Sequence, residues 1–304
     1  MTEHTDQIGT DYSHYSPVTR DAILDRLLTA LQSDKRIIGL LVVGSGAEGF
    51  EDIHSDIDLC AVTSLADDVK PTFQDWGVQI SEMLPLFHSL ESVRAPNVYL
   101  WVFLLENFLE IDLCFLCLDD LRATRNRWKT VLDRSGKIES IQQSSWENRP
   151  KPNLEETYRY RLSSLWHYVK HAAVAVQRKQ PWRAIYEIEQ IRNQTIELRG
   201  LRDELETKRF RHVDQMSEDF LTCLEHTLIS SLRKVDIMNA LKVVVSCFFS
   251  EARHFDKTLN LKLAKRFERK INTYLELFET GQFRENRGET SSNCLTSNFE
   301  TYQK

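Results

Sequence analysis

Two aspartates separated by a single residue are the feature of the sequence that most clearly suggests chemistry. Asp56 and Asp58 follow a glycine-rich turn that begins at Gly44 and Ser45, directly after the aliphatic run at 37–43. In an extended segment, side chains two residues apart project from the same face, so both carboxylates would point the same way. At about 5 Å and an effective dielectric constant near 20, two such charges repel by roughly 3 kcal/mol. We therefore expect a cation between them.

A third carboxylate would complete the site. Asp112 lies in a later strand-like segment, and Glu110 shares its face of that segment because the two are also separated by one residue. Carboxylate oxygens, with phosphates and water in the remaining positions, are typical of magnesium sites that handle nucleotides. Three carboxylates around metal ions can hold a nucleoside triphosphate and polarise an attacking hydroxyl. The sequence therefore predicts Mg²⁺ as the cofactor.

The turn before the aspartate pair is suited to phosphate. Gly44 has no side chain to prevent a close approach to backbone amides, and Ser45 adds a hydroxyl donor. No Lys or Arg occurs between Gly44 and Asp58; position 48 is Glu48, and His54 alone in this loop can carry a positive charge. We expect basic residues outside the loop to meet the charge of a triphosphate.

These residues resemble a known superfamily, the polymerase-beta-type nucleotidyltransferases. The stretch GSGAEG at 44–49, followed by SDIDL at 55–59, is similar to the minimal bacterial members and to the aminoglycoside and lincosamide nucleotidyltransferases. The resemblance covers residues 37–63 closely and 108–118 more loosely. The chain departs from many relatives at Glu48, where they carry Arg or Lys.

The resemblance implies a role for each matching residue. Gly44 and Ser45 would bind the triphosphate. Asp56 and Asp58 would ligate the metal ions. Asp112 would join them as a metal ligand and help to activate the acceptor, so that all three aspartates are catalytic.

The small-molecule enzymes of this resemblance pair the catalytic domain with a C-terminal helical domain, and the cleft between the two holds nucleotide and acceptor. In this chain, the first helix after the linker carries Arg159, Arg161, Lys170 and His171, which could supply the missing positive charge. Most arginines at such density are solvated helix surface. Lys170 is the member of this group that we retain as a candidate phosphate contact.

The second helix of that half adds further candidates. Glu187 or Glu189 could line the cleft as an acid that binds a cationic acceptor, or as a general base. Arg192 lies three residues after Glu189, so the two could equally form a surface ion pair. We expect Glu110 and these three residues to be possible acceptor or phosphate contacts.

The elements that would position these residues follow from hydrophobic periodicity. In the first half of the chain, this pattern predicts a small mixed sheet with flanking helices. The expected elements are a helix from Thr19, strands at 37–43 and 57–63, a helix at 72–88, and a hairpin of strands at 97–105 and 108–118. In the second half of the chain, the pattern predicts helices only, at 155–178, 181–198 with Gly200 as the stop, 214–230, 233–255 and 259–279. Trp166 and Trp182 are expected in the helical core. The fold class is therefore α+β, with a nucleotidyltransferase domain followed by a helical bundle.

Composition shifts define the expected domain boundaries. A polar stretch rich in proline separates the two halves, and both ends of the chain are polar with little periodicity. We expect a loose arm at 1–18, a catalytic domain at 19–134, a linker at 135–153, a helical substrate-binding domain at 154–281 and a disordered tail at 282–304.

Bulk composition limits the possible partners. The 304 residues are 41% hydrophobic, with 39 basic and 45 acidic side chains, for a net charge of −6. This balance gives no overall attraction to nucleic acid or anionic membranes. Of the six cysteines, Cys60, Cys114 and Cys117 fall in apolar strand-like runs, as small buried residues of a reducing compartment would. Without a secretory signal or a membrane-length apolar run, we expect a cytoplasmic protein, either monomer or homodimer.

The leading hypothesis is a magnesium-dependent enzyme that moves a nucleoside monophosphate from a nucleoside triphosphate to a hydroxyl of a small molecule, releasing pyrophosphate. An aminoglycoside or a lincosamide is the expected type of acceptor. Two alternatives stay open. The enzyme could act on RNA or on a protein partner, as in toxin–antitoxin pairs, or the chain could be a nucleotide-binding module without catalysis, as the loop without a cation would allow.

Overall fold

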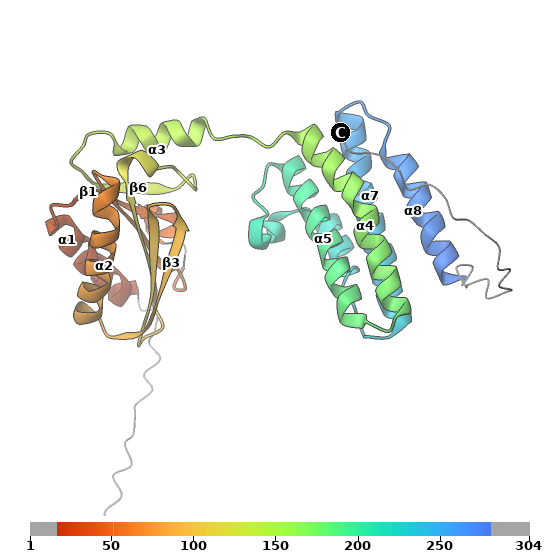
Figure 1. Ribbon diagram of the computed structural model, residues 1–304, viewed down its shortest axis with the longest axis horizontal. Coiled ribbons are helices and arrows are strands. Elements are labelled where there is room, and N and C mark those ends of the chain that lie inside the picture. The colour runs from red at the N-terminus through yellow and green to blue at the C-terminus, as the bar shows by residue number, and fades with distance from the viewer. Residues whose placement is uncertain (1–16, 51, 281–304) are drawn as a thin grey trace, which may run out of the picture. The chain divides into compact units, whose positions relative to one another are not determined.

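The computed structural model describes residues 17–50 and 52–280, which Figure 1 draws in colour. The chain separates into two compact units between Pro150 and Lys151. The predicted arm at 1–18 lies outside the described residues, except that Pro17 already begins the first helix. The predicted tail at 282–304 and the expected helix stop at Gly281 also lie outside them.

The first unit contains a mixed sheet in the strand order β3-β4-β5-β2-β1-β6. Strands β2 and β5 are parallel neighbours, whereas the other neighbouring strands are antiparallel. This sheet confirms the α+β class. The strands are β1 Ile37–Val43, β2 Ile57–Thr63, β3 Leu86–Ala95, β4 Val98–Leu105, β5 Glu110–Cys117 and β6 Trp128–Asp133.

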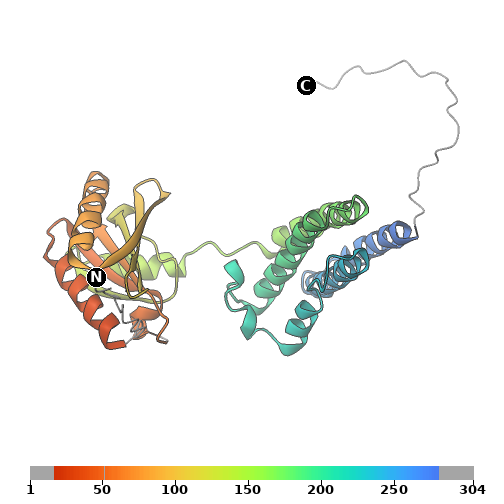
Figure 2. The same ribbon diagram turned by 90° about the horizontal axis from the view of Figure 1, so that it is seen from below.

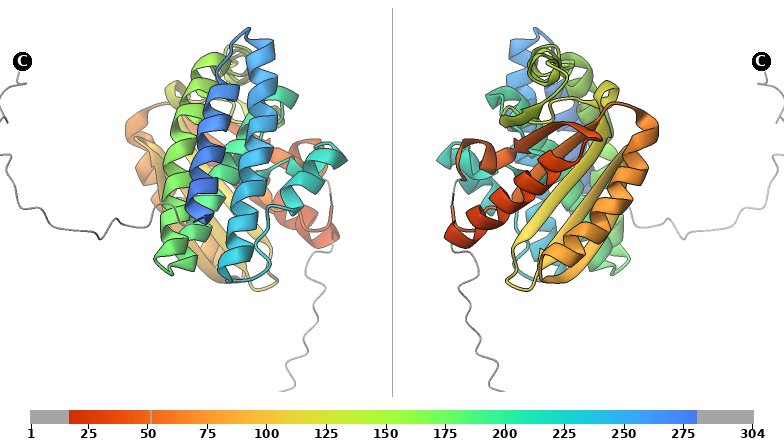
Figure 3. Two further views of the ribbon diagram at one scale, coloured as in Figure 1. Left: turned by 90° about the vertical axis from the view of Figure 1, so that its right-hand side faces the viewer. Right: turned by 90° about the vertical axis from the view of Figure 1, so that its left-hand side faces the viewer.

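Two helices cover one face of this sheet. They are α1, Pro17–Ser33, and α2, Ala66–Met83, and both lie in front of the strands in the right-hand view of Figure 3. Side chains from α1, α2 and the strands form one buried core between them, which includes alternate residues of β2 and β5. Because side chains alternate across a strand, the residues between these core positions point to the opposite face. The opposite face holds a smaller cluster that includes Ile138 of α3, Ile138–Glu147.

The structure confirms β1, β2 and the β4–β5 hairpin and corrects three other predictions. Helix α2 begins six residues before the expected 72, because Pro71 is accommodated inside the helix. Strand β3 was missed because it is an edge strand with mostly exposed side chains, so it shows no apolar alternation. The expected linker at 135–153 contains α3, which leaves only short non-helical stretches on either side. Short 3₁₀ helices follow β1 and β5, at η1 Gly44–Glu48 and η2 Leu118–Asp120.

The second unit consists of helices. Figure 2 shows α4 beside α5, and the left-hand view of Figure 3 shows α4, α7 and α8 packed along one another. Among the described residues, no helix is both long and apolar enough to cross a membrane. The helices are α4 Leu154–Gln177, α5 Pro181–Asp203, η3 Lys208–Phe210, η4 Val213–Gln215, α6 Glu218–Glu225, α7 Lys234–Thr258 and α8 Ala264–Glu279.

Three predictions for the helical unit are wrong. The helix expected at 214–230 is divided into the short η4 and α6, and α6 already ends at Glu225. Trp166 and Trp182 were expected in the core, but their exposed fractions are 51% and 72% because the core-facing positions of α4 and α5 are occupied by smaller residues such as Ala172, Ala173 and Ala184. Gly200 does not stop α5, which continues to Asp203. The core of the unit is formed instead by α4, α5, α7 and α8.

Candidate active site

The parallel pairing of β2 and β5 brings two of the three predicted aspartates together. Asp58 of β2 and Asp112 of β5 are direct partners in the register of the two strands. Their neighbours Ile57 and Ile111 are fully buried in the core against α1 and α2. Strand alternation therefore turns both carboxylates to the opposite face of the sheet, where the chain is more open.

Asp56 lies immediately before β2 and belongs to the same charge cluster. Partial burial, together with the charges of Glu110, Asp58 and Asp52, raises its pKa to about 6. A carboxyl group in such surroundings resists ionisation unless a cation is present. The three carboxylates nearest to Asp56 thus come from two neighbouring strands and the loop before one of them.

Asp112 is the most constrained of the three aspartates. Burial raises its pKa to about 6; Asp58, Glu110 and Asp56 act in the same direction, and only Arg94 opposes them. Its Oδ1 atom is buried and finds no hydrogen-bond partner among the described residues. A buried carboxylate oxygen without a donor is costly, so this atom is one that a bound cation or a proton would satisfy.

The glycine of the turn is required by the geometry around Asp58. Gly44 has a backbone φ of +71°, in the left-handed region that favours glycine. A Cβ atom at this position would lie 2.8 Å from Asp58 Oδ2 and 2.6 Å from a guanidinium nitrogen of Arg125. The backbone of η1 can therefore approach the carboxylate only without a side chain. Ser45 follows in η1, is partly exposed, and accepts a hydrogen bond at its carbonyl from Phe50.

An arginine of α1 holds the loop between η1 and Asp56. Arg20 is 5% exposed, and its guanidinium donates to the carbonyl oxygens of Asp52 and Ser55, at 2.7 and 3.2 Å. It also stacks on the ring of Phe50, 3.7 Å from the ring centroid. This residue was not predicted from the sequence, because nothing in its helix indicates a contact more than thirty residues away. Arg20 fixes the path of the chain into the aspartate pair.

The positive charge that the glycine-rich loop lacks is supplied within the first unit. The side chain of Arg125 lies 3.4 Å from Asp58 Oδ2. A cavity of about 190 Å³ is lined by Asp58 and Asp112 together with Arg122, Arg125 and Arg127. The three arginines belong to the segment between η2 and β6, directly after the strand that carries Asp112. These arginines were not among the residues predicted from the sequence, although the run RATRNR at 122–127 was the available signal.

The same segment accounts for Glu48, the residue at which the loop departs from its relatives. Glu48 Oε2 lies 3.6 Å from Nε of Arg127. An acid in the loop is thus matched by a base on the facing segment. Because Glu48 is well exposed, this pair contributes little stability. Its effect is to place Arg127 near η1.

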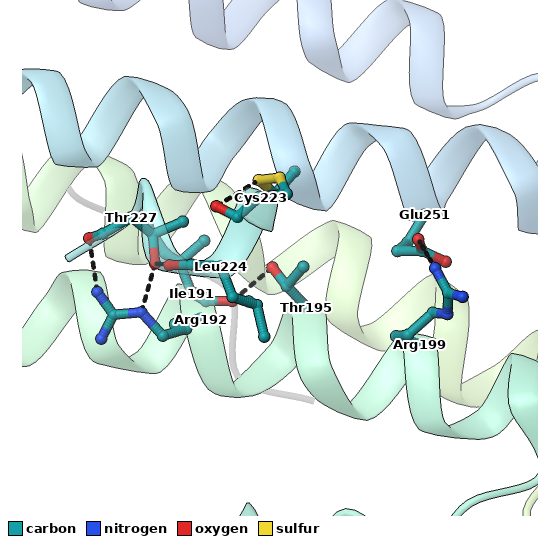
Figure 4. The surroundings of a disulfide bond; sticks show 9 residues. Ile191, Arg192, Thr195, Arg199, Cys223, Leu224, Thr227 and Glu251 are labelled. Atoms are coloured by element: carbon teal, nitrogen blue, oxygen red, sulfur yellow. Dashed lines mark hydrogen bonds and ion pairs between the residues drawn. A yellow bond between two sulfur atoms is a disulfide. The ribbon is translucent and has the colours of Figure 1, made fainter. Parts of the chain in front are cut away.

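The candidates in the helical unit have partners inside that unit. Arg192 is 7% exposed and donates to the hydroxyl and the carbonyl of Thr227, both at 2.6 Å, as Figure 4 shows. Arg192 also pairs with Glu189. Arg192 therefore connects α5 to the chain after α6, and Glu189 pairs with it on the same helix. Glu187 is 7% exposed and lies 3.9 Å from Nδ1 of His171, whereas Lys170 lines a cavity of its own unit.

The other two basic candidates on α4 form ion pairs with nearby acids. Arg159 pairs with Glu155 at 2.8 Å, and Arg161 pairs with Glu197 of α5 at 2.7 Å. Both are therefore engaged within the helical unit. Within the first unit, Arg125 forms an ion pair with Asp58 of the aspartate cluster.

A disulfide between Cys223 of α6 and Cys247 of α7 was not anticipated, and it is at odds with the expectation that the cysteines are free in a reducing compartment (Figure 4). Sequence spacing alone does not give cysteine pairing. Cys60, Cys114 and Cys117 are free and largely buried, as predicted. Cys114 lies on the Asp112 face of β5, whereas Cys117 lies in the core against α1 and α2.

A sequence model described as streptomycin adenylyltransferase matches residues 18–278. No curated protein gives a significant match to the chain. Among solved structures, the crystal structure of an aminoglycoside 6-adenyltransferase from Bacillus subtilis is 13% identical; the match covers 84% of this chain and 97% of that chain, with a TM-score of 0.41.

Proposed function

The chain belongs to the streptomycin adenylyltransferase family and is therefore a nucleotidyltransferase, and we propose that it transfers the adenylyl group of ATP to a hydroxyl of an aminoglycoside. The observation that carries this proposal is the pairing of Asp58 with Asp112 on parallel strands, beside a cavity lined by three arginines. Such a site offers carboxylates for metal and acceptor, and guanidinium groups for phosphate. The family supplies the nucleotide and the type of acceptor.

The three aspartates fit a divalent cation. Asp112 Oδ1 is buried with no hydrogen-bond partner among the described residues, and the pKa values of Asp56 and Asp112 are raised to about 6 by burial and neighbouring acids. Among the described residues, no group of three or more His, Cys, Asp or Glu side chains is arranged so that it could hold a metal ion by itself. Magnesium usually takes one or two carboxylates and completes its shell with phosphate oxygens and water. We therefore propose Mg²⁺ at Asp56, Asp58 and Asp112, where it would neutralise phosphate charge and polarise the phosphoryl group.

The protein's own groups would bind and orient the reactants. Gly44 leaves room for phosphate oxygens beside the amides of η1, and Arg125 would exchange its contact with Asp58 for one with the triphosphate. Asp112 would accept the proton of the acceptor hydroxyl as a general base. The hydroxyl oxygen then bonds to the α-phosphorus while the bond to the bridging oxygen breaks and pyrophosphate leaves. Glu110, on the same face as Asp112, is placed to attract the ammonium groups of an aminoglycoside.

For the helical unit the proposal is narrower. Glu187 and Lys170 remain predicted contacts of the acceptor or of phosphate. Glu189 pairs with Arg192, and Arg192 also donates to Thr227. We therefore assign both residues to the stability of the unit. Tests of the reaction should therefore begin with the first unit.

Pyrophosphate release by the purified full chain tests the proposal directly. We expect release with ATP, Mg²⁺ and streptomycin, with mass spectrometry showing one adenylyl group added to the antibiotic. Asp58→Asn should abolish turnover, because the residue would be both metal ligand and partner of Arg125. Asp67→Asn, an exposed acid in the first turn of α2, is the matched control and should keep it.

Two results would contradict the proposal. Full magnesium-dependent activity of Asp58→Asn would remove the metal site from the mechanism. The absence of pyrophosphate release with all four nucleoside triphosphates and a panel of aminoglycosides would remove the acceptor class. If labelled nucleotide were instead added to RNA ends, the enzyme would act on a polymer.

A further inference from the structure

A second cavity lies in the helical unit, at the turn that joins α4 to α5. It has a volume of about 220 Å³. Four of its lining side chains can carry positive charge, and none of its lining residues is acidic. The lining residues are Lys170, His171, Val174, Ala175, Arg178, Gln180 and Arg183.

These cations are not neutralised by the rest of the described chain. Lys170 and Arg178 form no ion pair with another described residue, and Arg183 contacts only Nδ1 of His171, at 3.5 Å, with one guanidinium nitrogen. The nearest acid is Glu187, which lies 3.9 Å from His171 but does not line the cavity. In a protein with a net charge of −6, this local excess of positive charge runs against the overall balance. Lys170, Arg178 and Arg183 are exposed, so solvent screens their mutual repulsion, but the positive field they share at the cavity favours an anion.

The backbone holds this arrangement rigidly. Helix α4 ends in a Schellman motif, in which the amide of Gln180 donates to the carbonyl of Ala175 at 2.9 Å and the amide of Lys179 donates to that of Val176 at 3.1 Å. Lys179 adopts the left-handed conformation that this motif requires, with φ of +57°. The turn therefore fixes the backbone positions from which Arg178 and Gln180 project.

We propose that this cavity is a binding site for a small anion that carries phosphate groups. Guanidinium groups bind phosphate oxygens in pairs, so Arg178 and Arg183 would hold the ligand and Lys170 would add a point charge. Val174 and Ala175 close the cavity with apolar side chains, and its volume suits a pyrophosphate group better than a polymer. The site is contained in the helical unit and does not depend on the reaction assigned to the first unit.

Inorganic pyrophosphate is the probe. Isothermal titration calorimetry would be carried out on the full chain at constant ionic strength with EDTA, so that no metal supports binding. Loss of charged hydrogen bonds in the double variant Arg178→Gln/Arg183→Gln should weaken binding by at least about tenfold. Lys179→Gly is the matched control, because it removes a charge from the same turn, does not line the cavity and suits the positive φ. Its affinity should stay within about twofold of the wild type.

Further measurements assign the binding event. Arg125→Met perturbs only the cavity of the first unit, so pyrophosphate binding that survives in Arg125→Met and is lost in the double variant belongs to the α4–α5 turn. Thermal unfolding checks that the double variant is folded, since Arg178 also lies at the C-terminal end of α4, where a cation interacts favourably with the helix dipole.

Three outcomes would overturn the proposal. These are wild-type affinity in the folded double variant, an equal loss in Lys179→Gly, and binding that disappears only in Arg125→Met. A single-stranded RNA oligonucleotide that binds more tightly than pyrophosphate, and is released by the double variant, would show that the turn contacts a polymer instead. None of these outcomes bears on pyrophosphate release, so the proposed reaction can fail or succeed separately.

Discussion

Replacing Asp112 by asparagine should stabilise the protein in the absence of metal above pH 6. The fold raises the pKa of this carboxyl from 3.8 to about 6, chiefly through burial. The folded chain therefore holds the proton more tightly than the unfolded chain. The resulting stability is fully present below about pH 4 and is lost as the pH rises through about 6. Asparagine carries no such charge, so the variant escapes this loss.

The size of the effect follows from the shift. At 1.36 kcal/mol per unit, a shift of about 2 units corresponds to roughly 3 kcal/mol. Asp112 is only partly buried, and solvent screens part of this energy, so we expect about 1 to 2 kcal/mol. Its Oδ1 atom has no hydrogen-bond partner among the described residues, so the substitution breaks no contact there.

Urea unfolding of both proteins at a series of pH values with EDTA would measure this difference. Hydrogen exchange of the β2 and β5 amides would assign the change to the first unit. The free energy of unfolding of Asp112→Asn, relative to wild type, should rise by about 1 to 2 kcal/mol between about pH 4 and pH 7. The exposed control Asp67→Asn should show no such trend. Millimolar Mg²⁺ should then stabilise the wild type more than Asp112→Asn.

A difference between Asp112→Asn and wild type that stays constant across this pH range would refute the electrostatic reasoning. A variant less stable than wild type at pH 7 in EDTA would refute it as well. In either case the carboxyl would be satisfied by a contact that its surroundings do not suggest.

Three further substitutions test the site and the helical unit. Gly44→Ala forces a side chain into a left-handed backbone and against Asp58, so we expect a loss of about 1 to 3 kcal/mol in urea unfolding and a large loss of kcat. Arg125→Met should raise the Kd for ATP at least about tenfold in calorimetry while leaving the fold intact, and an unchanged Kd would exclude Arg125 as a phosphate contact. Arg192→Met leaves the buried carbonyl of Thr227 without its donor and should cost about 2 to 4 kcal/mol of stability; a variant with wild-type stability but impaired acceptor binding would return Arg192 to the reaction.

The aspartates of the site were predictable because their signal is local. The spacing of Asp56 and Asp58 and the alternation around Asp112 are properties of single strands, and the resemblance joined them. The partner of Asp58 was not predictable in the same way. Arg125 lies 67 residues further along the chain, and its role depends on the order in which strands pair. Arg20, more than thirty residues before the loop that it holds, was missed for the same reason.

The secondary structure was likewise predictable only where a local pattern of buried residues marks an element. Strands with a buried face, such as β1, and helices with an apolar stripe, such as α4, were found nearly at their observed bounds. The edge strand β3 has no buried face, so its sequence carries no period-two pattern. Helix α3 is short and polar and packs through few residues, among them Ile138, and therefore resembles a linker in composition.

The parallel pairing of β2 with β5 also has a consequence for how the site can change and when it forms. A shift of β5 by one residue would turn Asp112 into the core and Ile111 out of it, so the register is held by burial as much as by hydrogen bonds. The turns between β3 and β4 and between β4 and β5 bear no such constraint, and insertions there would leave the two carboxylates adjacent. Because this contact joins Asp58 to Asp112 across two intervening strands, we expect the site to form only when β2 and β5 pair at the centre of the sheet.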